Sequence, residues 1–168
     1  MDNKVVSTLA RVADEIGIPS VRFNFRGVGK SAGEYGQTVG EQEDLRAVMA
    51  WVKSSLPGYR IGLAGFSFGS YISTQVATAG EVDWLVSIAP PRNMYSFSGI
   101  DRITCPWFVV MGDQDEIVPY AQVADWAAAP EAPVVFETMA GAGHFFHGRL
   151  LELKDRVTIW LRSIMTRD

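Results

Sequence analysis

The sequence predicts one α/β domain, residues 1–168, built on a mainly parallel sheet with helices on both faces. Short, nearly continuous apolar runs alternate with stretches whose apolar residues recur at the helical period of 3.6 residues. Such runs are typical of strands that are buried on both faces, and their alternation with helices favours parallel pairing through right-handed crossovers. The 168 residues, 48% hydrophobic and 20% charged, fit a globular domain rather than a disordered chain.

The first part of the chain predicts two helices around one strand. The first helix is capped by Asp2 or Asn3 and stops at Gly17, because these residue types favour helix ends. A strand is predicted over residues 21–25, and a glycine-rich loop follows it. A second helix begins near residue 41. The apolar positions that we expect it to turn inward are Leu45, Val48, Met49 and Val52.

The rest of the chain repeats this alternation. Further strands are predicted at residues 61–64, 84–88, 107–111 and 134–136. Helices are predicted at residues 70–79, after Pro119, and at residues 149–164. In open parallel sheets, ligands bind beyond the carboxyl ends of the strands, so the loops that follow the strands are where chemistry is expected.

Charge and composition exclude several classes of partner. Fifteen basic and nineteen acidic residues give a net charge of −4, the wrong sign for binding nucleic acid or anionic lipid. No apolar run approaches the roughly 20 residues of a membrane span, and no signal peptide is recognisable, so we expect a cytoplasmic protein without a membrane partner. Cys105 is the only cysteine, so neither a disulfide nor a zinc cluster is expected.

The most informative motif is Gly65-Phe66-Ser67-Phe68-Gly69, a G-x-S-x-G pattern between a predicted strand and a predicted helix. In that context a sharp turn pushes the serine hydroxyl out above the sheet, and the glycines keep the strand and helix from clashing. A serine hydroxyl is a weak nucleophile near neutral pH and needs a base that an acid orients.

The candidate base and acid lie after later strands. His144 is favoured as the base because it follows a strand in a glycine-rich loop, whereas His147 stands at the start of the last helix. One loop supplies three carboxylates: Asp113, Asp115 and Glu116. Asp113 and Glu116 read more simply as a solvated acidic turn before the next helix. Asp115 is the better candidate to orient the histidine, although spacing alone does not separate it from Asp113.

The chain order Ser67, Asp115, His144 on an α/β pattern resembles the α/β hydrolase superfamily, and in particular small lidless serine hydrolases near the dienelactone hydrolases. The resembling segments are the serine motif and residues 24–31, 112–119 and 143–146. The resemblance implies that Ser67 is the nucleophile, His144 the general base, Asp115 its orienter and the Phe68 amide an oxyanion donor. It implies no cofactor and no metal. Only residues 90–105 stand where larger hydrolases insert a cap, so an open site is expected.

The resulting functional prediction is cleavage of a small-molecule carboxylic ester or thioester through an acyl-enzyme. The alternative is a catalytically weak or inactive hydrolase-fold fragment or interaction module. Candidate walls of the substrate pocket are Tyr35, Met94, Tyr95 and Phe97, each of which could equally be ordinary packing.

The glycine-rich loop offers a rival interpretation, because Gly27, Gly29 and Ala32 satisfy the G-x-G-x-x-A pattern of dinucleotide sites. That fingerprint must open a helix, yet glycines continue the irregular stretch. A P-loop would require glycine at position 24, which is Asn24. A structural loop beside the site is therefore the prediction.

The resemblance also implies strands before the first helix, and a second oxyanion donor from the loop after the third of them. In that fold the third strand lies between the strands that correspond here to residues 21–25 and 60–64. We therefore expect Met1 to be an internal methionine of a longer hydrolase, the chain to lack the N-terminal strands, and its activity to be weak. If the chain is complete, the two flanking strands pair directly or borrow an edge from a second copy in a homodimer.

Overall fold

The computed structural model describes residues 3–129 and 134–166. In this part of the chain, four parallel strands form one sheet in the order β1-β2-β3-β4. The strands are β1 (Gly62–Phe66), β2 (Trp84–Ile88), β3 (Trp107–Gly112) and β4 (Val135–Met139). The helices are α1 (Lys4–Glu15), α2 (Val39–Ser55), α3 (Phe68–Ala77), α4 (Tyr120–Ala127), α5 (Leu150–Met165) and the short 3₁₀ helix η1 (Ile100–Arg102).

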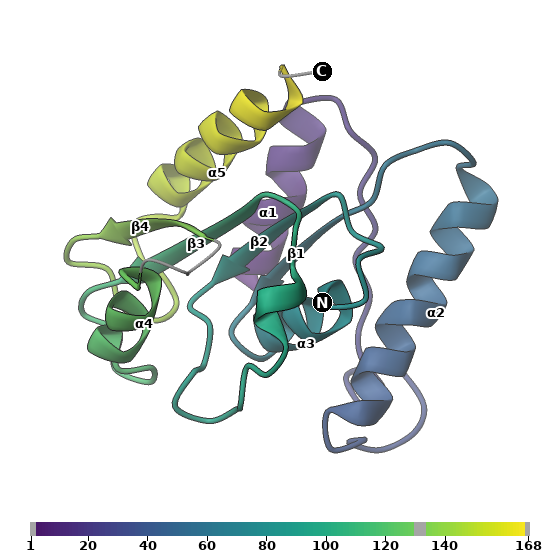
Figure 1. Cartoon of the computed structure of the whole chain (residues 1–168), viewed down its shortest axis with the longest axis horizontal. Helices are drawn as coiled ribbons and strands as arrows, with labels where there is room; N and C mark the ends of the chain where they lie inside the picture. The colour runs from purple at the N-terminus through teal and green to yellow at the C-terminus, as the bar shows by residue number, and fades with distance from the viewer. Residues whose placement is uncertain (1–2, 130–133, 167–168) are drawn as a thin grey trace.

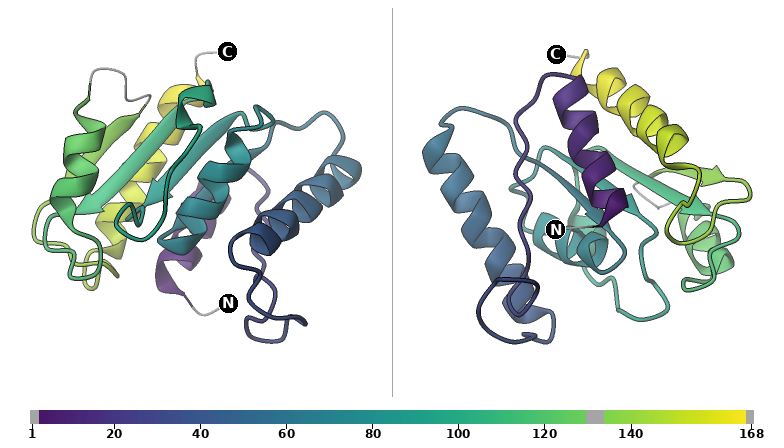
Figure 2. Two further views of the ribbon diagram at one scale, coloured as in Figure 1. Left: turned by 60° about the horizontal axis from the view of Figure 1, so that its bottom comes forward. Right: turned by 180° about the vertical axis from the view of Figure 1, so that it is seen from behind.

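The helices cover both faces of the sheet, as predicted. Helices α1 and α5 pack against each other on one face, while α3 and α4 lie on the other (Figures 1 and 2). Helix α2 stands beyond the β1 edge and packs on α3. The α/β class with parallel strands is thereby confirmed. Among the helices of the described residues, none has the length and apolar character that crossing a bilayer requires.

The centre of the core is formed by β2 and β3, whose apolar runs are buried on both faces. Phe108 of β3 stacks on Trp160 of α5, with 5.1 Å between the ring centroids. The Trp107 Nε1–H donates to the Ser87 Oγ at 3.0 Å, which satisfies both buried polar groups. Each fully buried large apolar side chain contributes about 1.5–3 kcal/mol to folding, so these two strands anchor the sheet.

Helix α1 shows why the local signals for helix ends are reliable. The Asn3 side chain accepts hydrogen bonds from the backbone N–H groups of Val5 and Val6, at 2.9 and 3.1 Å. The other cap candidate, Asp2, lies outside the described residues. Beyond the last turn, Gly17 adopts a φ of +77°, which a residue with a side chain rarely accepts.

The predicted strand at residues 21–25 is wrong. The segment runs between β1 and α2 as irregular chain (Figure 1), and no strand of the described residues pairs with it. A cavity of about 930 Å³ lies beside it, lined by this segment, by all of β1 and by Val48 and Val52 of α2. Paired strands lie about 4.8 Å apart, so the open space explains why the extended segment forms no ladder. Within the described residues, the segments 21–25 and 60–64 do not pair directly, and both line this cavity.

Candidate active site

Ser67 lies in the turn between β1 and α3, with φ 49° and ψ −119°. This conformation is sparsely populated for a residue with a side chain and is typical of a nucleophile held by its surroundings. A Cβ at Gly65 would lie 2.4 Å from the Gly69 carbonyl oxygen, so position 65 accepts no side chain without a shift of backbone. A Cβ at Gly69 would meet no atom of the described residues within 4 Å. The predicted need for clearance thus applies to Gly65 alone.

The three predicted triad side chains meet at the carboxyl end of the sheet. The His144 Nε2 lies 3.1 Å from the Ser67 Oγ, and the His144 Nδ1 lies 2.8 Å from the Asp115 Oδ2. Ser67 follows β1, Asp115 follows β3 and His144 follows β4. His144 is only 2% exposed. The arrangement can pass a proton from a hydroxyl to an imidazole whose other nitrogen faces a carboxylate.

Asp115 is held as a charged acceptor. Its Oδ1 accepts hydrogen bonds from the backbone N–H groups of Ile117 at 2.9 Å and Val118 at 2.7 Å. Burial acts to raise the pKa of Asp115, but the hydrogen bonds from the His144 ring and from the two amides outweigh it and hold the pKa below its ordinary value. An ionised Asp115 places the proton of the neutral imidazole on Nδ1 and leaves Nε2 free to accept the serine proton.

The other two carboxylates of the acid loop, here defined as residues 112–119, contact backbone rather than the imidazole. The Gly141 N–H donates to the Asp113 Oδ1 at 2.6 Å, and the His144 N–H donates to the Glu116 Oε2 at 3.0 Å. Of the two aspartates between which spacing did not decide, Asp115 lies next to the imidazole ring and Asp113 next to the Gly141 amide. The roles of Asp113 and Glu116 as acceptors from the opposite loop were missed, since nothing in the sequence fixes the distance between two loops.

The second histidine has a different environment. The His147 ring lies 5.8 Å from the Phe145 ring, and both residues line a small cavity of about 240 Å³ beside Lys4 and Val5. The His144 ring instead packs against Phe66 at 4.9 Å between centroids. Of the two histidines, both within the described residues, only His144 hydrogen-bonds the Ser67 Oγ.

The Phe68 backbone N–H is free to bind an oxygen. Phe68 is the first residue of α3, so this N–H has no partner within the helix. It donates no hydrogen bond to any other group within residues 3–129 and 134–166. The partial positive charge at a helix N-terminus adds to its attraction for an anion.

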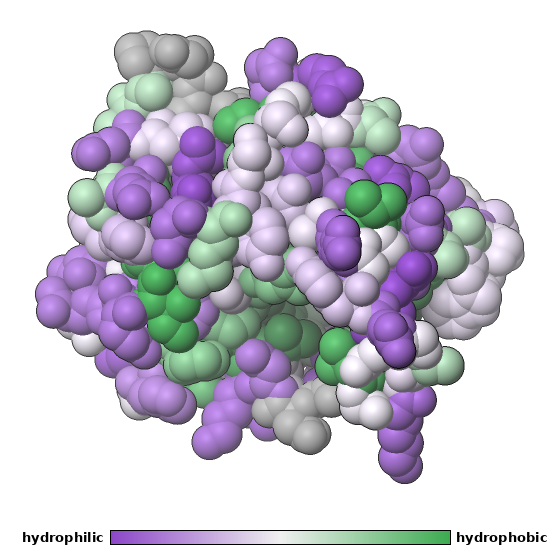
Figure 3. All heavy atoms as spheres, turned by 90° about the horizontal axis from the view of Figure 1, so that it is seen from below, coloured by the Kyte–Doolittle hydropathy of each residue, from purple (hydrophilic) through white to green (hydrophobic). Residues whose placement is uncertain are grey.

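Two of the four predicted wall residues have rings beside that of Phe68. Tyr35 and Tyr95 place their rings 6.1 and 5.7 Å from the Phe68 ring, next to the serine turn. Phe97 is only 8% exposed and packs in the core, whereas Met94 is 54% exposed. Seen from below the view of Figure 1, the surface has a hollow in which apolar side chains are exposed (Figure 3).

The glycine-rich loop opens no helix, as predicted. Gly27, Gly29 and Gly33 all have positive φ, and the Gly27 N–H closes the loop by donating to the Ala32 carbonyl at 3.1 Å. The backbone N–H of Arg26 donates to Asp44 at 2.9 Å, and its guanidinium forms an ion pair with the same carboxylate. This contact between Arg26 of the loop and Asp44 of α2 was not predicted, because it joins residues eighteen positions apart.

Comparison with known proteins finds this chain similar to hydrolases. The model of the dienelactone hydrolase family matches residues 31–156. An uncharacterized protein of Rickettsia prowazekii is 32% identical over 99% of this chain and 74% of its own length. The structure of an α/β serine hydrolase homologue from Coxiella burnetii is 51% identical, with a TM-score of 0.91 over 96% of this chain and 77% of its own. An α/β serine hydrolase without a lid from Xanthomonas campestris is 44% identical, with a TM-score of 0.90 over 97% and 74%.

Proposed function

This chain belongs to the dienelactone hydrolase family, and we propose that it hydrolyses carboxylic ester or thioester bonds by acyl transfer to Ser67. The observation that carries the proposal is the continuous contact from the Ser67 Oγ through the His144 ring to the Asp115 carboxylate. The side chains come from three separate loops. Ser67 gives up the proton, His144 accepts it, and Asp115 orients the imidazole ring.

In the first half-reaction the Ser67 Oγ attacks the substrate carbonyl carbon while the His144 Nε2, 3.1 Å away, takes its proton. The tetrahedral intermediate collapses when the imidazolium returns that proton to the leaving alcohol or thiol, and an acyl-serine remains. In the second half-reaction His144 takes a proton from water, which attacks the acyl carbon. Return of the proton to Ser67 releases the carboxylic acid and restores the enzyme.

Asp115 and Phe68 stabilise the charges that form during these steps. The ionised Asp115, 2.8 Å from the His144 Nδ1, stabilises the imidazolium. The Phe68 N–H, at the start of α3, donates to the oxyanion. Each oxyanion donor is worth about 10²–10³ in kcat.

Labelling with a fluorophosphonate probe tests the proposal. We expect wild-type protein to be labelled and to hydrolyse short-chain p-nitrophenyl esters, and we expect Ser67→Ala to do neither. Ser54→Ala is the matched control, because Ser54 is exposed on α2 and its hydroxyl donates to the Trp51 carbonyl within the same helix. Labelling that persists in Ser67→Ala refutes the nucleophile assignment. Folded wild-type protein with neither labelling nor turnover favours the non-catalytic alternative.

A further inference from the structure

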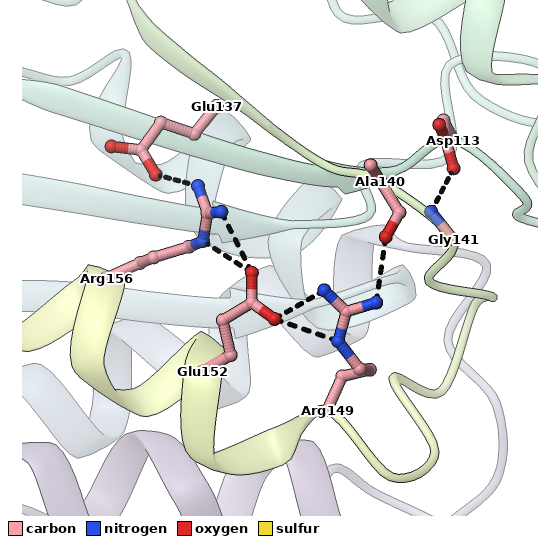
Figure 4. A network of polar contacts seen from close by, with 7 residues as sticks. All are labelled: Asp113, Glu137, Ala140, Gly141, Arg149, Glu152 and Arg156. Carbon is pink, nitrogen blue, oxygen red and sulfur yellow. Dashed lines mark hydrogen bonds and ion pairs between the residues drawn. The ribbon is translucent and has the colours of Figure 1, made fainter.

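The histidine loop, here defined as residues 140–149, is bound to the acid loop by more than the triad contact. The Gln114 N–H donates to the Ala142 carbonyl at 3.0 Å, and the Asp113 and Glu116 carboxylates accept from the N–H groups of Gly141 and His144. Figure 4 shows the Asp113 carboxylate directed at the Gly141 amide. Both acidic neighbours of the triad acid therefore hold the main chain that carries the triad base.

The Ala140–Gly141 peptide is held from both sides. Its N–H donates to Asp113 at 2.6 Å, while its carbonyl oxygen accepts from the Arg149 Nη1 at 2.8 Å (Figure 4). Arg149 closes the loop at its other end, just before α5, so the contact ties together the first and last residues of the histidine loop. The loop is thus fixed at its base as well as at His144.

Arg149 is itself fixed by a chain of ion pairs along α5. Its guanidinium pairs with Glu152, which also accepts from Arg156 at 2.8 Å. Arg156 reaches across to Glu137 of β4 at 2.8 Å (Figure 4). Glu137 belongs to the strand that leads into the histidine loop, so the network returns to the sheet. Each of these pairs is partly exposed and contributes little to stability by itself, but together they fix the direction of the Arg149 side chain.

Glu116 and Asp115 both accept a hydrogen bond from His144, at different atoms. Asp115 holds the His144 ring at Nδ1, and Glu116 holds the His144 backbone N–H at 3.0 Å. The N–H of His144 lowers the pKa of Glu116, which keeps the acceptor charged. A Cβ at Gly143 would lie 2.8 Å from the Glu116 Oε2, so the contact also depends on the absence of a side chain there.

We propose that Asp113, Glu116 and Arg149 are positioning residues that hold the histidine loop, and through it the His144 ring, at hydrogen-bonding distance from Ser67. The proposal rests on the proposed function, because it assigns these side chains a purpose in the Ser67–His144 relay. None of the three touches the serine in the described residues. Their effect on rate comes from geometry, since displacement of a reacting group by about 1 Å can cost about 10²-fold.

Kinetics of matched variants test the proposal. In Glu116→Ala, Asp113→Ala and Arg149→Ala we expect kcat and the rate of fluorophosphonate labelling to fall together, by about tenfold, with KM within about twofold of wild type. Glu116→Gln, which keeps an oxygen that accepts the same N–H, should recover most of the loss. Hydrogen–deuterium exchange of the histidine loop should accelerate in the alanine variants and stay close to wild type in Glu116→Gln.

Gly143→Ala perturbs the same contact from the other side. It should lower kcat by a factor similar to Glu116→Ala. The double variant Gly143→Ala/Glu116→Ala should be no slower than either single variant, because both changes remove the same hydrogen bond, from the His144 N–H to Glu116. The controls are Asp125→Ala on α4 and Arg46→Ala on α2, which remove exposed charges away from both loops and should leave kcat and exchange unchanged.

The outcomes separate this proposal from the proposed function. Wild-type kcat retained within twofold in all three alanine variants overturns the positioning role, as does an equal loss in Glu116→Gln and Glu116→Ala. If wild-type protein shows neither turnover nor labelling, the proposed function fails, and exchange alone then reports on the loop. In that case unchanged exchange in the alanine variants overturns the positioning role, and faster exchange supports it.

Discussion

The two glycines of the serine turn should respond in opposite ways to the same substitution. In Gly65→Ala the new Cβ would lie 2.4 Å from the Gly69 carbonyl oxygen and 2.5 Å from the Ser70 nitrogen, both backbone atoms that cannot rotate away. Overpacking of this kind costs about 2–3 kcal/mol. For a domain of this size that corresponds to a fall in Tm of about 4–12 °C. Because the first turn of α3 must move, Ser67 moves with it, and labelling by a fluorophosphonate should fall at least about tenfold.

Gly69→Ala is the internal comparison. Its Cβ enters space that is free of described atoms within 4 Å, at the second residue of α3. Alanine is up to about 1 kcal/mol more favourable than glycine in a helix, so Tm should stay level or rise by a few degrees. Circular dichroism melts and labelling of the two variants in parallel provide the measurement. A Gly65→Ala protein that melts within 1–2 °C of Gly69→Ala would show that the strand and helix have slack at this turn, and the reasoning would be wrong.

Three further predictions concern Asp115, the half-buried Arg92 and the cavity beside β1. Asp115→Asn should lower kcat by about 10²–10⁴. Because the folded pKa of Asp115 is depressed, its contribution to stability is present above the unfolded value near 4 and is lost as pH falls through the folded pKa, so acid unfolding titrations of Asp115→Asn should lack that step. One guanidinium nitrogen of Arg92 is buried with no hydrogen-bond partner in the described part of the chain. The guanidinium lies 4.5 Å from the centre of the Trp126 ring, and burial lowers the pKa of Arg92. Arg92→Met should therefore raise the free energy of unfolding by roughly 1 kcal/mol, and Tm with it. A clear fall in Tm would show that the contacts of the guanidinium with aromatic rings outweigh its desolvation. The apolar cavity beside β1 should bind an apolar dye such as ANS in the folded protein, and Val52→Glu on its wall should reduce the dye fluorescence while Tm changes by only a few degrees.

Features that depend on local sequence were predictable, and features that depend on contact between distant segments were not. The Asn3 cap and the Gly17 stop follow from residue type, and the buried runs of β2 and β3 follow from their continuous apolar character. Residues 21–25 alternate apolar and polar side chains, which is also a strand pattern, but a strand exists only where a neighbour completes its ladder. That information lies outside the segment itself.

The same distinction applies to the site. The serine motif names Ser67, because the turn, the flanking strand and the helix are all encoded within a few residues. His144 could be chosen from two histidines by its place after a strand. The choice between Asp113 and Asp115 could not be made from spacing, because both stand in one short turn and differ only in which atom of the opposite loop each one reaches.

The position of the cavity gives β1 a special place in the proposed mechanism. Among the described strands, β2 and β3 each have a neighbour on both sides, whereas β1 pairs with β2, and residues of β1 line the cavity together with Phe68 and Gly69. Asp115 and His144 come from loops after β3 and β4, which are held to each other. The nucleophile and the histidine thus both follow edge strands of the described sheet, but only the histidine loop is tied to the acid loop by the Asp113 and Glu116 contacts. A change that loosens β1 should displace Ser67 relative to a histidine and an aspartate that stay together, so loss of activity should precede loss of the Asp115–His144 contact.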